Sequence, residues 1–178
     1  NNQRVWWCTF HPNSNITRAE ILLIILKSSE TSVPDSDGNL CFPDLTKWHW
    51  SVKYVCFAHK NGIAKWYSDW EFKPNWDVSV LEALALSLNT FDIKLPIQKE
   101  WEEWYDSYIK YANDNKIIPK NAYTINTKAK RGQVSQIITR IQELKLWKSL
   151  NYSSLWCGSN NNLNDTNSIN VNGKNRSY

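Results

Sequence analysis

The chain has 178 residues, 42% of them hydrophobic, and a formal net charge of +4 from 21 basic and 17 acidic residues. This length can bury a substantial core, while the charge is too small to indicate a nucleic-acid-binding protein by itself. The longest apolar run, residues 21–26, is far shorter than the ~20 residues that cross a bilayer, so we expect no membrane span. The 11 Trp and 8 Tyr are unusual, because such rings serve either as core anchors or as platforms for sugars and partners.

The first predicted helix covers residues 17–29 and begins at a capping box. Glu20 follows Thr17 by three residues, so the Thr17 side chain can accept from the Glu20 N–H while the Glu20 carboxylate accepts from the Thr17 N–H. Pro12 and the Asn and Ser residues after it exclude a helix before this point. A loop therefore ends, and an apolar helix begins, at Thr17.

A second helix is predicted over residues 47–60, after a Ser/Pro/Asp/Gly-rich connection at 30–44. Trp50 and Tyr54 share one face of this helix, which predicts that both lie in the core. Gly62 is a good helix terminator, since glycine adopts the left-handed conformation freely.

Three further helices are predicted. The helix at 79–90 begins at a second capping box, made by Ser79 and Glu82. An amphipathic helix follows at 100–115, and a last helix at 130–146 starts without a capping residue.

The sequence repeats itself, which indicates a repeat protein. An offset of 62 relates one set of positions to another (Phe10, Pro12, Asn13, Ile16 and Glu20 to Phe72, Pro74, Asn75, Val78 and Glu82). An offset of 54 relates a second set (Trp50, Tyr54, Val55, Ala58 and Ile63 to Trp104, Tyr108, Ile109, Ala112 and Ile117), so Trp104 and Tyr108 are also predicted core residues. A weaker third copy of the first set covers 123–141.

Four cysteines permit three disulfide pairings. A bond between Cys41 and Cys56 would tie a loop to the helix that follows it, and Cys8 and Cys157 would then join the two ends of the chain. The alternative is four buried thiols in a cytosolic protein. We favour two disulfides and an extracellular location.

Several of these segments resemble the S-layer homology (SLH) domain. The resemblance covers about residues 8–145 and is carried by the run Ile16-Thr17-Arg18-Ala19-Glu20 and by segments 41–44, 50–63 and 72–74. It implies a mainly α fold, with tandem helical repeats around a pseudo-threefold axis, on a bacterial or archaeal surface. The implied organisation of the chain has five parts (partial repeat 1–30, repeat 41–90, degenerate repeat 91–146, closing segment 147–157 and an Asn/Ser-rich tail at 158–178).

The resemblance also implies non-covalent anchoring to an anionic cell-envelope polysaccharide, held between repeats. The candidate polysaccharide-binding residues are Arg18, Glu20, Trp66, Tyr67, Glu82, Arg131 and Gln133. Arg18 is the first helical residue, where free N–H groups and the helix dipole attract anions. Trp66 and Tyr67 can stack on sugar rings or pack as a loop core. For Glu20 and Glu82, a plain capping box is the simpler interpretation.

Enzyme activity is not expected. The three histidines are scattered, no catalytic or phosphate-binding motif is present, and no Cys-x-x-Cys spacing suggests zinc, so we expect neither cofactor nor metal. The alternative to anchoring is a structural subunit of a surface layer or extracellular filament, which would assemble with copies of itself or with other surface proteins through its repeats and tail. The degenerate copies favour the structural subunit, and the intact motif at 17–20 favours anchoring. Nucleic acid is not an expected partner.

Overall fold

The computed structural model describes residues 10–35, 40–65, 67–99, 101–118 and 127–156. Within these ranges it contains five helices, joined by long loops, and isolated β-bridges in place of strands. The helices are α1 (Arg18–Ser28), α2 (Val52–Lys60), α3 (Val80–Thr90), α4 (Asp106–Asp114) and α5 (Arg131–Trp156). The predicted mainly α fold class is confirmed.

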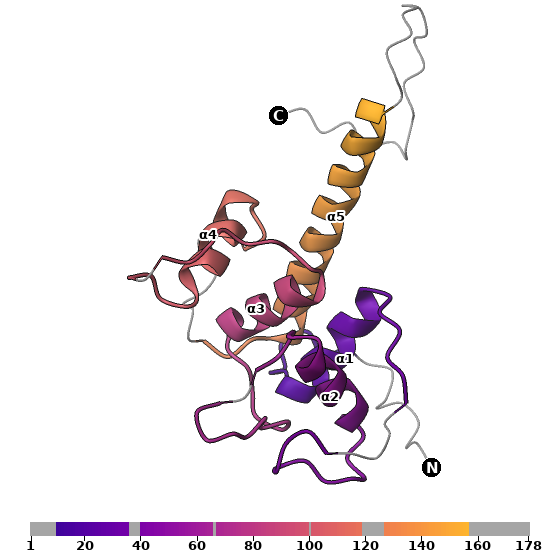
Figure 1. Ribbon diagram of the computed structural model, residues 1–178, viewed down its shortest axis with the longest axis vertical. Helices are drawn as coiled ribbons and strands as arrows, with labels where there is room; N and C mark the ends of the chain where they lie inside the picture. Colours follow the sequence, from indigo (N-terminus) through magenta and orange to yellow (C-terminus); the bar gives the residue numbers. More distant parts are fainter. Residues whose placement is uncertain (1–9, 36–39, 66, 100, 119–126, 157–178) are drawn as a thin grey trace, which may run out of the picture.

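Helices α1, α3 and α5 contact one another, and each of the two shorter helices packs on one of them. Helix α2 lies against α1, and α4 lies against α3 (Figure 1). Because α3 touches α1, α4 and α5, nearly all of its side chains from Val80 to Leu88 are buried, with Glu82 as the exception. A helix that is apolar on all sides is expected at such a central position.

Both predicted capping boxes are present. The side chains of Thr17 and Ser79 accept from the N–H groups of Glu20 and Glu82, and the two glutamates accept from the backbone N–H groups of their capping residues. Helices α1 and α3 therefore begin where the sequence predicts.

The three loop-to-helix junctions meet in a closed ring of backbone hydrogen bonds. Ile16 N–H donates to Ala129 (3.2 Å), Ala129 N–H donates to Val78 (2.8 Å), and Val78 N–H donates to Ile16 (3.2 Å). All three residues are buried. We call these junctions corner one (residues 14–18), corner two (76–80) and corner three (127–131). The pseudo-threefold arrangement of the whole repeats stays a prediction.

A second ring of hydrogen bonds links the same corners at the start of each helix. The first N–H of each helix donates to a backbone carbonyl of another corner (Arg18 to Trp76, 2.9 Å; Val80 to Thr127, 2.9 Å; Arg131 to Ser14, 3.0 Å). The N-terminal N–H groups of a helix have no partner inside the helix. Here each corner supplies the acceptor that another corner lacks, so the three junctions hold one another in register.

The repeats also share backbone conformation at equivalent positions. Three pairs of residues have positive φ at the repeat offsets (His11 and Lys73, 47° and 59°; Glu30 and Asp92, 56° and 52°; Gly62 and Lys116, 69° and 54°). Ile63 and Ile117, which follow the last pair, donate to the carbonyls of Ala58 and Ala112 at 2.8 Å. Such a bond after a left-handed residue is the usual end of an α-helix.

Two helices start later than the sequence predicts. Helix α2 begins at Val52 rather than 47, because successive turns precede it and its first N–H donates to the His49 carbonyl (3.1 Å). Helix α4 begins at Asp106 rather than 100, and the Asp106 carboxylate accepts from the Glu103 N–H (2.9 Å). Local bonds of this kind compete with helix formation.

Helix α5 ends ten residues later than predicted. It continues through the expected closing segment to Trp156, because no glycine or proline interrupts the sequence after Gly132. Its distal part extends away from the other helices (Figure 1). Leu146 and Trp147 are exposed. None of the described helices combines the length and the hydrophobicity needed to cross a bilayer. The predicted tail, 158–178, lies outside the described residues.

The predicted Cys41–Cys56 disulfide is present, with an S–S distance of 2.05 Å. It ties the loop before α2 to the middle of that helix. The predicted Cys8–Cys157 bond lies outside the described residues.

Asp44 connects the loop before α2 to the loop before α3. Its carboxylate accepts from the N–H groups of Phe72 (2.9 Å) and Lys73 (2.7 Å). Backbone N–H groups bonded to a carboxylate make strong, charge-assisted contacts. Asp44 thereby fixes the turn that leads into corner two.

Candidate functional site

Three of the predicted site residues meet between corners one and two. The Arg18 guanidinium donates to the Tyr67 hydroxyl (3.3 Å) and to the Glu82 carboxylate (3.4 Å), and Tyr67 donates to Glu82 (2.5 Å). Arg18 comes from α1, Glu82 from α3 and Tyr67 from the loop between α2 and α3. We call this contact seam 1–2, after the corners that it joins.

The Arg18 side chain is enclosed rather than presented to solvent. Only 7% of it is exposed, and its guanidinium lies 4.6 Å from the ring centroid of Tyr67 and 4.9 Å from that of Phe72. A further bond runs to the Lys65 carbonyl (2.7 Å), while the Arg18 Nε has no hydrogen-bond partner among the described residues. Cation–π contacts of a partly desolvated guanidinium stabilise its charge.

This environment shifts the ionisation of Tyr67 and Glu82 in opposite directions. Burial and the hydrogen bond to Glu82 raise the pKa of Tyr67 to about 12. Burial by itself would raise the pKa of Glu82, but it is outweighed by hydrogen bonds from Ser79 and Tyr67 and by the charge of Arg18, so the pKa of Glu82 is lowered. At neutral pH the seam therefore holds a guanidinium, a carboxylate and a neutral phenol.

The expectation of free N–H groups beside Arg18 is wrong. The first three N–H groups of α1 all have acceptors (Arg18 to Trp76, 2.9 Å; Ala19 to Pro74, 2.9 Å; Glu20 to Thr17, 3.3 Å). Because these groups are used within the ring of corners, the helix N-terminus offers no open anion site. Any attraction of an anion to this seam must come from side chains.

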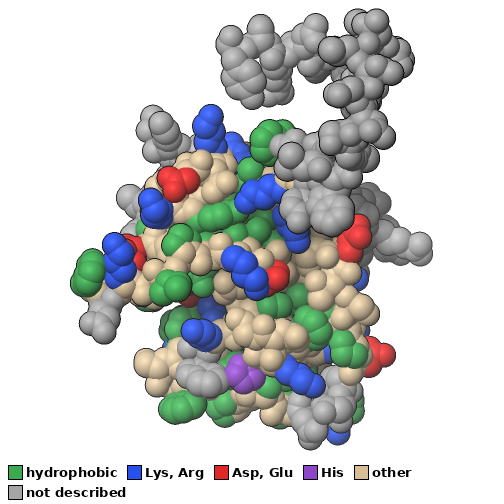
Figure 2. Space-filling view, turned by 45° about the horizontal axis from the view of Figure 1, so that its top comes forward, with side chains coloured by type: hydrophobic (Ala, Val, Ile, Leu, Met, Phe, Trp, Pro, Cys, Tyr) green, Lys and Arg blue, Asp and Glu red, His purple; other side chains and the backbone are tan. Residues whose placement is uncertain are grey.

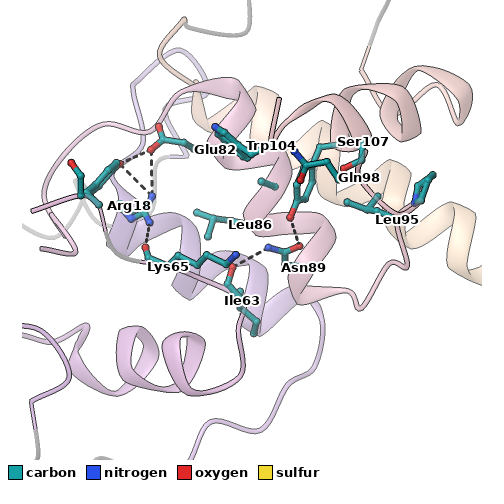
Figure 3. Close-up of a pocket in the computed structure, with 15 residues that line it drawn as sticks. Arg18, Ile63, Lys65, Glu82, Leu86, Asn89, Leu95, Gln98, Trp104 and Ser107 are labelled. Carbon is teal, nitrogen blue, oxygen red and sulfur yellow. Dashed lines mark hydrogen bonds and ion pairs between the residues drawn. The ribbon is translucent and has the colours of Figure 1, made fainter. Parts of the chain in front are cut away.

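Seam 1–2 opens into a cleft of about 680 Å³ that also reaches α4. In Figure 3, Arg18 and Glu82 face each other on the left, the Trp104 ring is drawn beside Glu82, and Gln98 and Ser107 lie farther to the right. We call this the Arg18 cleft. Lys65 and Asn89 also line it, and Asn89 accepts from the Tyr108 hydroxyl (3.1 Å) and donates to the Ile63 carbonyl (3.2 Å). Its size is in the usual range for small-ligand sites.

The prediction that Trp50 and Trp104 are core residues is wrong. Each tryptophan is 50% exposed and lies near the tyrosine four residues later, with ring centroids 6.4 Å apart for the tilted Trp50–Tyr54 pair and 6.0 Å for the edge-on Trp104–Tyr108 pair. The tyrosines are partly buried and pack against the core, which leaves each tryptophan at the surface. Trp104 therefore presents an aromatic ring to the Arg18 cleft.

The predicted residues Arg131 and Glu20 meet at a different place, between corners three and one. Arg131 donates to the Glu20 carboxylate (3.3 Å) and to the Phe10 carbonyl (3.1 Å). This contact, seam 3–1, repeats the arginine–glutamate pair of seam 1–2. It is more open, since 27% of the Arg131 side chain and 38% of the Glu20 side chain are exposed.

The remaining seam, 2–3, has lost both members of the pair. At the other two seams the first residue of one helix bonds the glutamate that follows the cap of another helix by three positions. At seam 2–3 these two positions are occupied by Val80 and Gln133. Val80 is buried, and the Gln133 side chain accepts from the Lys130 N–H (2.8 Å) in place of a capping glutamate. An unpaired buried charge is costly, so loss of the arginine is compatible with loss of the facing carboxylate.

Six of the seven candidate residues thus fall on three seams rather than in one site. Arg18, Tyr67 and Glu82 lie together, Arg131 pairs with Glu20, Gln133 lies on the uncharged seam, and Trp66 lies outside the described residues. The predicted site did not include most residues of the Arg18 cleft, among them Lys65, Asn89, Gln98, Trp104 and Ser107. The repeat offset links Trp104 to Trp50, but no local pattern shows that α4 brings it to Arg18.

Comparison with known proteins agrees with these motifs. Residues 42–79, from the loop before α2 to corner two, match the sequence profile of the S-layer homology domain. The resemblance to the S-layer homology family is confirmed. A "Cell surface protein" of Thermoanaerobacter kivui is 24% identical to the chain over 142 residues, which are 78% of this chain and 18% of that protein.

"Cell surface glycoprotein 1" of Acetivibrio thermocellus is 31% identical over 83 residues, or 46% of this chain and 4% of that protein. The chain therefore spans less than a fifth of the length of either relative. The SLH match begins at Phe42, just after the first cysteine of the disulfide, and ends at Ser79, the cap of α3.

Proposed function

We propose that this chain is a cell-surface SLH module that anchors a protein non-covalently to an anionic cell-envelope polysaccharide. The observation that carries the proposal is the Arg18 cleft, of about 680 Å³, whose lining joins a guanidinium–carboxylate pair to a half-exposed tryptophan. The names of the two relatives support the surface location.

The lining of the Arg18 cleft suits an acidic sugar. Its charged side chains are Arg18, Lys65 and Glu82, two cations against one carboxylate, which leaves a net charge of +1. Trp104 offers a flat face on which a sugar ring can stack. The polar side chains of Gln98 and Asn89 provide hydrogen-bond donors and acceptors for hydroxyl groups.

Arg18 has a positioning role in this proposal. Its guanidinium is already bonded to Tyr67, Glu82 and the Lys65 carbonyl, so it fixes the geometry of these groups and contributes positive charge at its end of the cleft. The exposed Lys65 ammonium is the group that contacts the anion of the polymer. Replacement of Arg18 would disturb both the seam and ligand binding, so a loss of affinity in such a variant would not show which of the two was its cause.

Trp104→Ala tests the proposal more cleanly. We expect it to weaken binding of purified cell-wall polysaccharide by about tenfold, because a stacking platform is lost. Trp101→Ala is the matched control, since Trp101 is 80% exposed and does not line the cleft. Equal affinity of the two variants in a calorimetric titration would contradict the proposal.

The distal part of α5 favours a second candidate function, a structural subunit. It carries exposed Leu146 and Trp147, and on parts of the face drawn in Figure 2 hydrophobic side chains lie next to basic ones. Such surfaces can join copies of a protein. Sedimentation of the intact chain and of a chain without residues 158–178 tests this, since assembly that needs the tail should be lost on deletion.

A further inference from the structure

A second hollow, of about 470 Å³, lies between the segment after α3, helix α4 and the middle of α5. It shares no lining residue with the Arg18 cleft. Three lysines line it: Lys94 follows α3, and Lys145 and Lys148 lie three residues apart on α5. Among the described residues of the lining, Asp92 alone is acidic, so three positive charges and one negative charge leave a net charge of +2. We call this the lysine hollow.

The two lysines of α5 are held by neutral acceptors. Lys145 donates to the Phe91 carbonyl (3.1 Å), and Lys148 donates to the Tyr111 hydroxyl (3.2 Å). Each ammonium also lies near an aromatic ring, 5.7 Å from the Phe91 centroid and 5.5 Å from that of Tyr111. These acceptors carry no charge, while the Asp92 carboxylate, which pairs with Lys94, also interacts electrostatically with Lys145. An ammonium has three donors, so each keeps donors for a ligand.

A structural role accounts for only part of this cluster. Phe91 is the C-cap of α3, and a cation at the C-terminus of a helix stabilises its dipole, which explains Lys145. The same argument does not extend to Lys148, which bonds a tyrosine of α4. Lys94 pairs with Asp92 (2.6 Å), but both side chains are about four-fifths exposed, and such surface pairs contribute little stability.

The hollow joins this charge to an apolar wall. Phe91 is buried, and Ile93 and Tyr111 are partly buried beside the lysines. A carboxylate or phosphate satisfies ammonium donors, while the less polar face of a sugar ring packs on aromatic carbon. We propose that the lysine hollow binds an acidic saccharide unit, with its anionic group on Lys94 and Lys148 and its ring against Tyr111. This inference does not rest on the function proposed for the Arg18 cleft, although one polymer that reached both sites would gain from the double contact.

The test is a titration of the full chain with glucuronic acid, followed by amide NMR, with glucose and inorganic phosphate as separate probes. Glucuronic acid should shift the amide signals of Tyr111 and Lys148, and glucose should not. The double variant Lys94→Gln/Lys148→Gln should weaken glucuronic acid binding at least tenfold, because two charge-assisted contacts are lost. Both side chains are exposed, so the variant is expected to fold.

Matched controls distinguish binding at the lysine hollow from non-specific attraction of an anion to the positively charged protein. Lys27→Gln/Lys60→Gln removes the same charge from exposed positions outside the hollow and should leave binding unchanged. Trp104→Ala should also leave it unchanged, so failure of the Arg18 cleft and failure of the lysine hollow are distinguishable. Equal weakening by both double variants would overturn the proposal, as would shifts caused by phosphate but not by glucuronic acid.

Discussion

Seams 1–2 and 3–1 carry the same arginine–glutamate pair in different surroundings. At seam 1–2 the arginine is 7% exposed and lies between two aromatic rings, and the seam opens into a cleft. At seam 3–1 the arginine is 27% exposed, and its second bond is to the Phe10 carbonyl. Seam 2–3 has no such pair. One repeated corner thus yields a buried charge pair, an exposed one and an uncharged contact, so the motif by itself does not define a binding site.

Replacement of the two arginines should show the largest difference. Arg18→Met is expected to lower the free energy of unfolding by about 3 kcal/mol, because it leaves Glu82 partly buried without its cation. Arg131→Met is the matched control and should cost about 1 kcal/mol or less, as is usual for an exposed pair. Urea denaturation of both variants makes the comparison. Equal losses would show that the burial of seam 1–2 has no energetic consequence.

Removal of the Tyr67 hydroxyl should have the next largest effect. Tyr67→Phe is expected to cost about 1.5 kcal/mol at pH 8, since a hydrogen bond to a carboxylate is lost. The pKa of Tyr67 is raised to about 12, so the unfolded chain releases the phenolic proton near pH 10 while the folded protein retains it. Wild-type stability should therefore fall as the pH rises from 10 towards 12, and the Phe variant should lack this component. Parallel pH profiles of the two proteins would contradict the assignment.

The uncharged seam can be given the missing pair. Val80→Arg and Gln133→Glu should each destabilise the protein, and the double variant should recover about 1 kcal/mol through the new ion pair. A double-mutant cycle from thermal unfolding measures this coupling. A coupling of zero would mean that the order of the ring does not bring these two positions together.

The smallest effect concerns the ends of α2 and α4. Gly62 and Lys116 occupy equivalent positions with φ of 69° and 54°, which favour glycine. Lys116→Gly is expected to stabilise the protein by about 0.5–1 kcal/mol, and Gly62→Lys to destabilise it by a similar amount. Differential scanning calorimetry of both variants checks this, and shifts of the same sign would contradict it.

Local sequence rules predicted the corners well. The capping boxes at Thr17 and Ser79 depend on residues three apart, and the Cys41–Cys56 bond depends on a loop next to its own helix. The start of α4 was predicted less well, because a bond from Glu103 to Asp106 competes with the helix. The extension of α5 was also missed, although the absence of a breaking residue could have indicated it.

The candidate site was predicted in part, because its members come from distant segments. The motif named Arg18 and Glu82, but only the ring of corners shows that each arginine bonds the glutamate of another corner. Trp104 was assigned to the core by its repeat match to Trp50, whose own assignment rested on helical periodicity, and the half-exposed position of Trp104 depends on how α4 packs against α3. Periodicity along one helix does not report such packing.

The measurement that tests the binding account most directly is hydrogen–deuterium exchange of the full chain with and without saturating cell-wall polysaccharide. The Arg18 cleft predicts slower exchange for segments 65–68 and 104–108, with no change in α2. Protection confined to α2, or no protection of either cleft segment while the polymer is bound, would contradict it.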